Sequence, residues 1–481
     1  MTLPADSWDK VRSEFQRLWG YEDFRPPQGE VIATLLAQRD TLVVLPTGGG
    51  KSICFQLPAL LQTGLTLVVS PLIALIENQV DELRRRQLPA AQFHSELPAQ
   101  HRQQTLWALE HGKLRLLYLS PESLLSEAIW QRLMQPKLKI NGLILDEAHC
   151  LVQWGETFRP AYRRLGAVRP AFLKAKPAGS QIAIAAFTAT ADPQTQQTIQ
   201  RVLQLEQPAV FRLSPYRPNL KLQIRTVWTP RGRRQQLLQF IQTQPGTGLI
   251  YTRSRRDTEA LTTELAAQGY PTAAYHAGLG PTDRRRIEAA WLQGELHFVV
   301  CTCAFGMGID KTNCRWVFHF HAPALLSEYV QEIGRAGRDG KPAQAVMLIS
   351  EPTGWLDPAD KQRQQFFQNQ ERQQQQLARQ LIHQIPVQGE VKVIVRQFKH
   401  GAMALSLLHS VGQLKWLDPF HYVINRSAIP QALAQKKAIQ KMAQYLHTKS
   451  CRWQFILEAF GFAQDADALK EGCGHCDRCL S

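Results

Sequence analysis

Two short polar segments, each directly after an apolar run, carry the residue types that bind and hydrolyse a nucleoside triphosphate. Pro46-Thr-Gly-Gly-Gly-Lys-Ser52 follows the run Thr41–Leu45, and Asp146-Glu-Ala-His149 follows Gly142–Leu145. Apolar runs of this length predict buried strands, and open parallel sheets place their ligands beyond the carboxyl ends of such strands. We therefore expect both segments at one edge of a sheet.

The first segment has the composition of a phosphate-binding loop. Glycines let backbone N–H groups approach phosphate oxygens, and a helix that starts near Lys51 directs its positive end at them. We expect Lys51 to reach the β- and γ-phosphates of ATP and the Ser52 hydroxyl to bind Mg²⁺. The strict pattern has glycine where Leu45 stands, so a simple glycine turn is the alternative for this segment alone. The loop residues expected to contact the nucleotide are Thr47, Gly48, Gly49 and Gly50.

The second segment supplies the acidic groups that such a loop requires. Asp146 is expected to hold the Mg²⁺, and Glu147 to orient and deprotonate the attacking water. A chance acidic pair is the alternative. Both segments occur after apolar strands and in this order, and this combination favours a site that hydrolyses a nucleotide.

The bulk composition indicates a basic protein with several domains. The 481 residues include 56 Lys and Arg against 40 Asp and Glu, a net charge of +16. This length predicts about three domains, and the charge favours a polyanionic partner, with a merely soluble basic protein as the alternative. No apolar run reaches the roughly 18 residues of a membrane span, and no signal peptide is recognisable. We expect a cytoplasmic location, no membrane partner, and cysteines that serve as thiols or metal ligands.

Short apolar runs alternate with helical stretches over most of the chain. The alternation predicts an α/β domain with a mostly parallel sheet at residues 1–207 and a second one at 208–351. The second has no Gly-Lys-Ser segment, so one nucleotide is expected between the two. The Gln-rich stretch 361–384 is expected to form a linker helix rather than a low-complexity tail. The strand candidates are Thr41–Leu45, Leu65–Ser70, Ala91–His94, Leu114–Leu119, Gly142–Leu145, Gln181–Phe187, Thr247–Thr252, Thr272–His276, His297–Thr302, Arg315–Phe320 and Ala343–Ile349.

The segment that follows the acidic pair is rich in aromatic residues. Cys150-Leu-Val-Gln-Trp-Gly-Glu-Thr-Phe-Arg-Pro160 resembles the aromatic-rich loop of RecQ-family DNA helicases of superfamily 2, with Trp154, Phe158 and Arg159 as the matching residues. Aromatic rings stack on unpaired bases and an arginine contacts phosphate, so the resemblance implies DNA binding here. A packed hydrophobic turn is the alternative for this segment alone.

Further segments resemble RecQ motifs. Gly20–Gln28 matches the adenine-recognition motif through Tyr21, Arg25 and Gln28. Tyr21 is expected to stack on the ring and the Gln28 amide to bond its edge. Ala304–Lys311 resembles motif V and Gln331–Gly340 motif VI. The resemblance implies nucleotide contacts from Gly308, Asp310 and Gln331, and DNA contacts from Ser70, Pro71, Thr188, Thr190, Arg253, Ser254 and Thr302.

Two arginines of the motif VI segment have a clear physical role. Arg335 and Arg338 belong to the second predicted domain and are expected to face the γ-phosphate held by the first. Such an arginine finger neutralises transition-state charge and typically raises turnover by about 10³ or more. We favour Arg338 as the main contact, with Arg335 in support. Hydrolysis would then depend on closure of the two domains.

Four cysteines near the end of the chain have the spacing of a metal site. Cys473, Cys476 and Cys479 form two consecutive Cys-x-x-Cys pairs, and Cys451 lies upstream. Their thiolates suit tetrahedral Zn²⁺, although an iron–sulfur cluster accepts the same spacing. The RecQ resemblance favours zinc, and His475 is a competing ligand. The remaining cysteines are expected to be core thiols: Cys54, Cys150, Cys301, Cys303 and Cys314.

The region 352–481 departs from the usual RecQ pattern. Many RecQ proteins carry a winged-helix domain after the zinc module, whereas this sequence ends two residues after Cys479. Residues of about 385–425 instead predict a winged-helix-like insert inside a mostly helical zinc-binding region: a helix or strand at Gly389–Phe398, a helix at Ala402–Val411, and a hairpin of Gly412–Leu417 and Phe420–Ile424. We hypothesise that it wedges the duplex, the alternative being a packing insert without DNA contact. The hairpin residues expected near the fork are Lys415, Trp416, Phe420, His421 or Tyr422.

The sequence as a whole predicts two tandem RecA-like domains followed by the zinc-binding region. The resemblance implies an ATP-dependent helicase that moves 3′ to 5′ on single-stranded DNA, unwinds forked DNA in recombination and repair, and works in the cytoplasm at the nucleoid. ATP, Mg²⁺ and Zn²⁺ are the expected cofactors; the sequence identifies no protein partner. Two alternatives remain open. One is a DEAH-type RNA helicase, and the other is an ATP-gated DNA-binding or strand-annealing protein that does not unwind.

Overall fold

The chain divides into two compact units. The computed structural model describes residues 5–152, 159–305, 309, 311–427 and 435–480. Unit 1 comprises Met1–Leu45, Gly49–Leu213 and Gln370–Ala434, and unit 2 comprises Pro46–Gly48, Ser214–Asn369 and Gln435–Ser481. Among the described helices, none has both the length and the apolar character needed to cross a bilayer.

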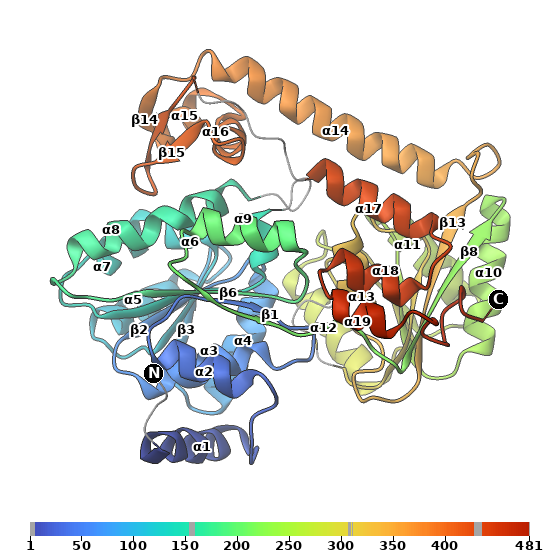
Figure 1. The fold of residues 1–481 in the computed structure, drawn as a ribbon, viewed down its shortest axis with the longest axis horizontal. Coiled ribbons are helices and arrows are strands. Elements are labelled where there is room, and N and C mark those ends of the chain that lie inside the picture. The colour runs from blue at the N-terminus through green and yellow to red at the C-terminus, as the bar shows by residue number, and fades with distance from the viewer. Residues whose placement is uncertain (1–4, 153–158, 306–308, 310, 428–434, 481) are drawn as a thin grey trace. The chain divides into compact units, whose positions relative to one another are not determined.

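Unit 1 is built on a parallel sheet, which has seven strands in the described part of the chain (Figure 1). The strands are β1 (Thr41–Val44), β2 (Leu65–Val69), β3 (Ala90–Phe93), β4 (Leu116–Leu119), β5 (Ile140–Leu145), β6 (Ala183–Thr188) and β7 (Ala209–Arg212). They lie in the order β3-β4-β2-β5-β6-β1-β7. β1 to β6 are buried along their whole length, because helices cover both faces of a parallel sheet. The helices are α1 (Ala5–Trp19), α2 (Gln28–Leu36), α3 (Lys51–Leu61), α4 (Ile73–Arg85), α5 (Ala99–Glu110), α6 (Pro121–Leu124), α7 (Glu127–Leu133), η1 (Ala148–Leu151), η2 (Pro160–Ala167), α8 (Val168–Ala175) and α9 (Pro193–Leu203).

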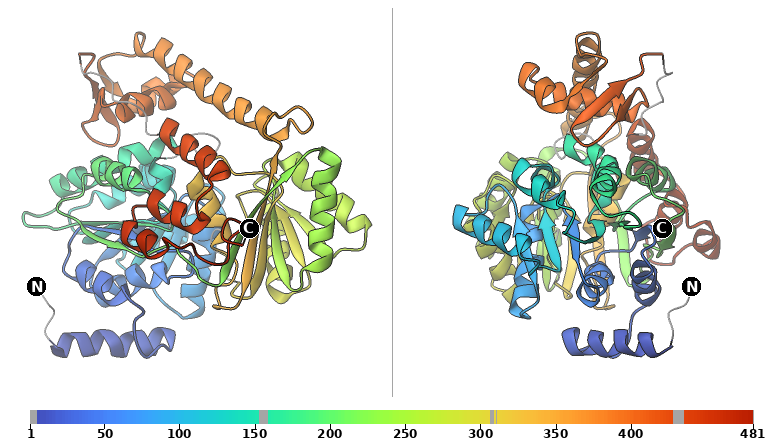
Figure 2. Two further views of the ribbon diagram at one scale, coloured as in Figure 1. Left: turned by 45° about the vertical axis from the view of Figure 1, so that its right-hand side comes forward. Right: turned by 90° about the vertical axis from the view of Figure 1, so that its left-hand side faces the viewer.

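Unit 2 contains a second parallel sheet, seen in Figure 2 as a layer between helices, with six strands in the residues described. The strands are β8 (Leu220–Val227), β9 (Thr247–Tyr251), β10 (Thr272–Tyr275), β11 (Phe298–Cys301), β12 (Cys314–His319) and β13 (Ala343–Ser350). Their order is β10-β11-β9-β12-β13-β8, so β8 is an edge strand. The helices are α10 (Pro230–Thr243), α11 (Arg255–Ala267), α12 (Pro281–Gln293), α13 (Leu326–Ile333), α17 (Gln435–His447), α18 (Arg452–Ala459) and α19 (Ala463–Ala468).

The two predicted α/β sheets are confirmed, but two strands were not among the candidates. β7 alternates between half-buried and exposed residues, and β8 carries four half-buried or exposed residues in succession near its end, only one of which is apolar. Both are edge strands, which lack the continuous apolar run that identifies a strand buried on both faces. β7 also extends the first sheet a few residues past the predicted domain boundary at 207.

A small antiparallel sheet with two helices forms the predicted insert. Its elements are β14 (Gln388–Glu390), α15 (Val391–Gln397), α16 (Gly401–Ser410), β15 (Leu414–Trp416) and β16 (His421–Ile424). The sheet order is β14-β16-β15, so the segment predicted as helix or strand contains one of each. Strand, two helices and a hairpin, preceded by the helix α14 (Ala359–Ile382), follow the element order of a winged-helix module.

The core of the insert corrects part of the wedge hypothesis. Trp416 is only 7% exposed and Tyr422 is fully buried, and both pack with Leu405 and Leu408 of α16. They are therefore core residues that cannot reach a DNA fork. Lys415 and His421, by contrast, are exposed. The predicted helix and hairpin are present as α16 and β15–β16, but which hairpin face is buried depends on the long-range contact with α16.

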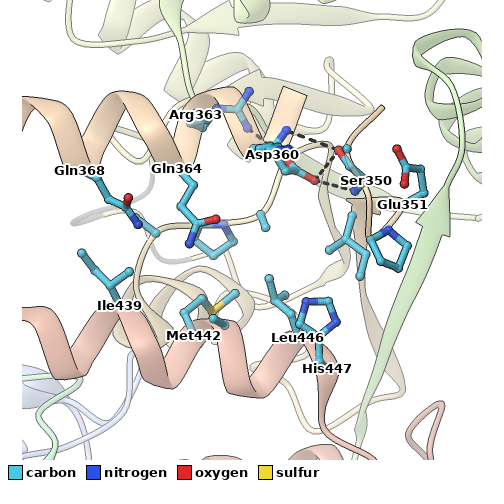
Figure 3. Close-up of a pocket in the computed structure, with 18 of the residues that line it drawn as sticks. Ser350, Glu351, Asp360, Arg363, Gln364, Gln368, Ile439, Met442, Leu446 and His447 are labelled. Atoms are coloured by element: carbon cyan, nitrogen blue, oxygen red, sulfur yellow. Dashed lines mark hydrogen bonds and ion pairs between the residues drawn. The ribbon is translucent and has the colours of Figure 1, made fainter. Parts of the chain in front are cut away.

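The Gln-rich stretch forms α14, as expected for a linker helix. At its start, Asp360 accepts hydrogen bonds from the backbone N–H and hydroxyl of Ser350, at 2.6 and 3.0 Å, which ties the helix to the end of β13. Between α14 and α17 lies a cavity of about 380 Å³ (Figure 3). Gln364 and Gln368 line its α14 side, and apolar side chains such as Met442 line its α17 side.

Docking of α16 in unit 1 is expected to weaken in acid. Burial, with Arg163 and Arg201 nearby, lowers the pKa of His409 to about 3. The unfolded ring takes up a proton below about pH 6.5, while the folded ring stays neutral. Stability is therefore full above that pH and falls by about 1.4 kcal/mol per pH unit down to about pH 3. Hydrogen exchange of the α16 amides should show about 2 kcal/mol less protection at pH 5 than at pH 7.

The variant His409→Gln lacks the titrating ring and serves as the reference. Its α16 amides should lose much less protection between the two pH values, after correction for intrinsic exchange rates. An equal loss in the variant and the wild type would contradict this origin of the pH dependence.

Candidate active site and metal centre

The phosphate loop ends in a left-handed glycine that starts α3. Gly50 has φ +70°, and α3 begins at Lys51. The Gln28 amide donates to the carbonyl oxygens of Gly49 and Gly50 at 3.2 and 3.4 Å. A Cβ on Gly50 would collide with this amide, so both the backbone conformation and the close approach require glycine here. The structure thus brings the predicted adenine-binding segment and the loop together.

The other residues of the adenine-binding segment lie at the surface. Tyr21 is 53% exposed, and its ring centroid lies 5.8 Å from that of Phe15. Arg25 is exposed, and its backbone N–H donates to the Gln28 side-chain oxygen at 3.0 Å. Both side chains are accessible to a ligand.

The acidic pair lies at the carboxyl end of β5, opposite the start of α3. The Lys51 Nζ is 4.0 Å from a Glu147 carboxylate oxygen. Asp146 accepts a hydrogen bond from the Gln79 amide at 3.0 Å. Burial, together with the neighbouring Glu147 carboxylate, raises the pKa of Asp146 to about 6. A bound cation would favour the ionised carboxylate, so Asp146 and the Ser52 hydroxyl at the start of α3 fit a Mg²⁺ site.

A buried histidine joins the acidic pair to Thr188, one of the predicted DNA contacts. The Nδ1 of His149 lies 3.2 Å from Glu147 Oε2 and 3.0 Å from the hydroxyl oxygen of Thr188 at the end of β6. The Thr188 hydroxyl oxygen accepts a hydrogen bond from the backbone N–H of Thr190 at 3.2 Å. Sequence reasoning missed His149 and Gln79 as site residues. His149 stands within the acidic segment itself, whereas Gln79 gave no signal beyond a polar residue on the apolar face of α4.

Three of the remaining residues of unit 1 predicted to contact DNA are buried. Ser70, Pro71 and Thr190 are buried, and the two hydroxyls have no hydrogen-bond partner within the described part of the chain. Arg159 has a side chain about one-third exposed and donates to the Glu122 carboxylate at 3.1 Å. Trp154 and Phe158 lie outside the described residues.

In unit 2, Arg253 is part of a buried ion pair. Its two terminal nitrogens donate to the Glu332 carboxylate at 3.0 and 2.8 Å, and His319 lies 2.7 Å from the same carboxylate. Burial opposes ionisation, but Arg253 and His319 lower the pKa of Glu332 to about 2. Ser254 caps α11 by accepting from the Asp257 backbone N–H at 3.0 Å. The predicted DNA contacts of Arg253 and Ser254 remain predictions.

The other residues of unit 2 include predicted nucleotide ligands and the predicted DNA contact Thr302. Arg335 is 5% exposed, and Arg338 donates to the Ile309 carbonyl oxygen at 3.1 Å. The hydroxyl of Thr47 donates to the carbonyl oxygen of Gly334 at 2.9 Å. For three further residues the structure gives local contacts only: Gly48 has φ +83°, the Gln331 side-chain nitrogen has no partner among the described residues, and the Thr302 hydroxyl oxygen accepts from Ala304 N–H at 3.4 Å. Gly308 and Asp310 lie outside the described residues.

The four predicted cysteines come together in unit 2. The sulfur atoms of Cys451, Cys473, Cys476 and Cys479 lie within 4.8 Å of one another. Two sulfurs bound to one tetrahedral zinc at about 2.3 Å would be roughly 3.8 Å apart. In the structure, Cys479 Sγ lies 3.4 Å from Cys476 Sγ and 3.9 Å from Cys473 Sγ, so the donor set fits zinc. His475 is not part of the cluster.

The cysteine cluster is anchored to the edge strand β8. Arg452 donates two hydrogen bonds to the Asp477 carboxylate, at 2.9 and 3.0 Å. The Asp477 backbone N–H donates to the Leu222 carbonyl oxygen at 2.9 Å, and the Trp453 indole N–H donates to the Leu220 carbonyl oxygen at 3.1 Å. The sequence did not indicate this attachment, because Cys451 and β8 lie far apart along the chain.

The expectation for the other cysteines holds with one correction. Cys54, Cys150, Cys301 and Cys314 are buried, as expected, but Cys303 is exposed. Cys303 lies in the turn that follows β11, where the chain has already left the core.

Comparisons with known proteins agree with this architecture. Residues 25–199 match the family model of the DEAD/DEAH box helicases, 232–340 that of the helicase conserved C-terminal domain, and 420–480 that of the RecQ zinc-binding region. Among solved structures, Mss116p bound to single-stranded RNA and AMP-PNP is similar with a TM-score of 0.61 at 17% identity, over 74% of this chain and 76% of that chain. The helicase MrfA bound to DNA reaches 0.59 at 19% identity, over 73% and 52%. The fold is therefore that of a helicase with two RecA-like domains.

Sequence relatives identify the family. The ATP-dependent DNA helicase RecQ of Synechocystis sp. is 53% identical over 473 residues, which cover 98% of each chain. The protein of the same name from Pasteurella multocida is 41% identical over 70% of this chain, and the match spans about half, 52%, of that protein. The chain belongs to the RecQ family of ATP-dependent DNA helicases.

The cysteine cluster gives a testable metal stoichiometry. The purified protein should contain one zinc per chain, and Cys476→Ser should lose it, because a fully buried ligand cannot be replaced by solvent at no cost. We expect the melting temperature to fall by roughly 10 °C, since structural zinc contributes directly to folding. Cys303→Ser is the matched control, and it should keep both the zinc and the stability. Retained zinc in Cys476→Ser would contradict the assignment.

Proposed function

We propose that this RecQ-family helicase hydrolyses ATP to move 3′ to 5′ along single-stranded DNA and to unwind forked DNA in recombination and repair. The observation that best supports the proposal is the continuous set of contacts from Lys51 through Glu147 and His149 to Thr188. It connects residues with nucleotide chemistry to a segment that resembles a DNA-binding motif. The proposal includes that the protein acts in the cytoplasm, at the nucleoid, because its proposed substrate is DNA.

Each residue of the acidic site has a distinct task in this proposal. The loop glycines and Lys51 bind the phosphates, and Mg²⁺ supplies charge neutralisation when it is bound by Ser52 and Asp146. Glu147 orients the attacking water and accepts its proton. His149 holds the Glu147 carboxylate in place and connects it to the Thr188 hydroxyl. Burial strengthens these charge interactions, since little water competes for them.

The two arginines of unit 2 complete the proposed reaction. Arg338, supported by Arg335, would neutralise the charge that develops on the γ-phosphoryl group. These residues act only when the second helicase domain closes on the first. DNA bound to both domains would favour closure, so hydrolysis would follow DNA binding.

Substitutions of Glu147 and of the two arginines test this proposal. We expect Glu147→Gln to lower the kcat of DNA-stimulated ATP hydrolysis by about 10²- to 10⁴-fold, because the general base is lost, and to abolish fork unwinding. Arg338→Ala should cost about 10³-fold, and more than Arg335→Ala. Glu127→Gln, an exposed carboxylate on α7, is the control and should behave as wild type. The assays compare 3′-tailed with 5′-tailed forks.

The same assays separate the alternatives. Wild-type ATP hydrolysis that DNA does not stimulate would overturn the proposal. Stronger stimulation by RNA would favour an RNA helicase. DNA stimulation without unwinding of either fork would favour strand annealing or gated DNA binding, and preference for the 5′-tailed fork would reverse the proposed direction.

In this proposal the insert also contacts the DNA fork, but through fewer residues than the sequence suggested. Only Lys415 and His421 of the five hairpin candidates are exposed, since Phe420 packs against the apolar core of unit 1. Trimming the hairpin would disturb that packing, so point substitutions are the better test.

The double variant Lys415→Ala and His421→Ala should unwind forked DNA at least about 3-fold more slowly, because it loses contacts to the phosphate backbone. ATP hydrolysis stimulated by single-stranded DNA should be unchanged. Glu390→Gln, exposed on β14 of the same sheet, is the control. Unwinding at the wild-type rate would refute a wedge role for the hairpin.

A further inference from the structure

Within unit 1, the insert packs on the α/β domain through the helix that winged-helix modules usually present to DNA. α16 lies against η2, and the Ser406 hydroxyl, 1% exposed, donates to the Pro160 carbonyl oxygen at 3.5 Å. Ala167, the last residue of η2, belongs to the apolar core of the insert. α16 is thus occupied by protein contacts and is not available to enter a DNA groove.

The hairpin turn makes a second attachment. The Arg164 guanidinium of η2 donates to the Pro419 carbonyl oxygen at 3.3 Å. The Phe420 ring meets Trp130 of α7 edge-on, with centroids 5.0 Å apart. Trp130 in turn stacks on Phe172 of α8, again at 5.0 Å. Two separate parts of the insert therefore contact the same region of the α/β domain of unit 1.

η2 is held equally closely on its other side. It packs against α9 and η1, and a Cβ on Gly166 would collide with the Val202 carbonyl oxygen, which shows how tightly η2 and α9 fit. Tyr162 and Leu165 of η2 are fully buried in the core of unit 1. η1 begins at Ala148, directly after Glu147, and contains His149. A packed path therefore leads from the insert through η2 and η1 to the acidic site.

We propose that the insert is a brace for the ATPase site, in which Ser406, Pro419 and Phe420 are positioning residues. By holding η2 against η1 and α9, they fix the backbone that carries Glu147 and His149. None of the three touches nucleotide or DNA in this role. The brace explains why an insert with the winged-helix order turns its α16 inward, whereas duplex recognition by α16 would require the opposite orientation.

Substitutions of Phe420 by smaller apolar residues test the brace. The brace proposal rests on the ATPase activity proposed above. Hydrogen exchange reports on η1 and η2, and kcat and KM for ATP are measured with saturating oligodeoxythymidine. Phe420→Ala should raise exchange in η2 and η1 and lower kcat by about 5-fold, or roughly 1 kcal/mol, with a smaller change in KM. Phe420→Leu should recover most of both effects. Gln397→Ala, exposed on α15, should show neither.

Three results would overturn the brace. Exchange in η2 could rise with kcat unchanged, kcat could fall with exchange unchanged, or neither could move. If Phe420→Ala does not fold, Ser406→Ala combined with Arg164→Met removes two other contacts and is judged in the same way. A wild-type enzyme that DNA fails to stimulate would overturn the proposed function instead, so the two failures are distinguishable.

Discussion

The group of charges at the carboxyl end of β5 is the constraint on which unit 1 depends. Asp146, Glu147 and His149 are each less than 10% exposed, and the Lys51 ammonium group faces them. Charges withdrawn from water in this way are stable only when every partner is in place. The parallel sheet positions these partners, because β5 and β6 end at the same edge. The Gln79 amide supplies the remaining hydrogen bond, and Gly50 allows α3 to start close by.

The sequence predicted the fold where burial leaves a simple pattern. Runs such as Leu65–Ser70 are mostly apolar because helices cover both faces of the sheet, and every predicted strand of the two sheets is present in the structure. β7 and β8 were not predicted, because an edge strand exposes one side and lacks a continuous apolar run. The same reasoning predicted candidate residues for the active site but not the contacts that the structure shows among them. The ion pair of Arg253 and Glu332 and the contact of His149 with Thr188 join positions far apart in sequence, which no local pattern encodes.

The insert illustrates a second limit of sequence reasoning. Its helices and hairpin follow from local periodicity and turn residues, and its winged-helix order was predicted. Which surface faces solvent depends on where the module docks. Trp416 and Tyr422 resemble residues that stack on bases, yet they fill a core of their own. Aromatic residues in a short hairpin are therefore ambiguous until the partner of each face is known.

The attachment of the cysteine module also protects the second sheet. β8 is an edge strand, and an unpaired strand edge is a template for pairing with other chains. Asp477 and Trp453 occupy carbonyl groups of that edge, and the Ile224 N–H donates to the Asp477 carboxylate at 3.4 Å. A chain deprived of its metal would release this cover and leave β8 free to join other molecules. We therefore expect the supply of zinc to affect the aggregation of the protein as well as its folding.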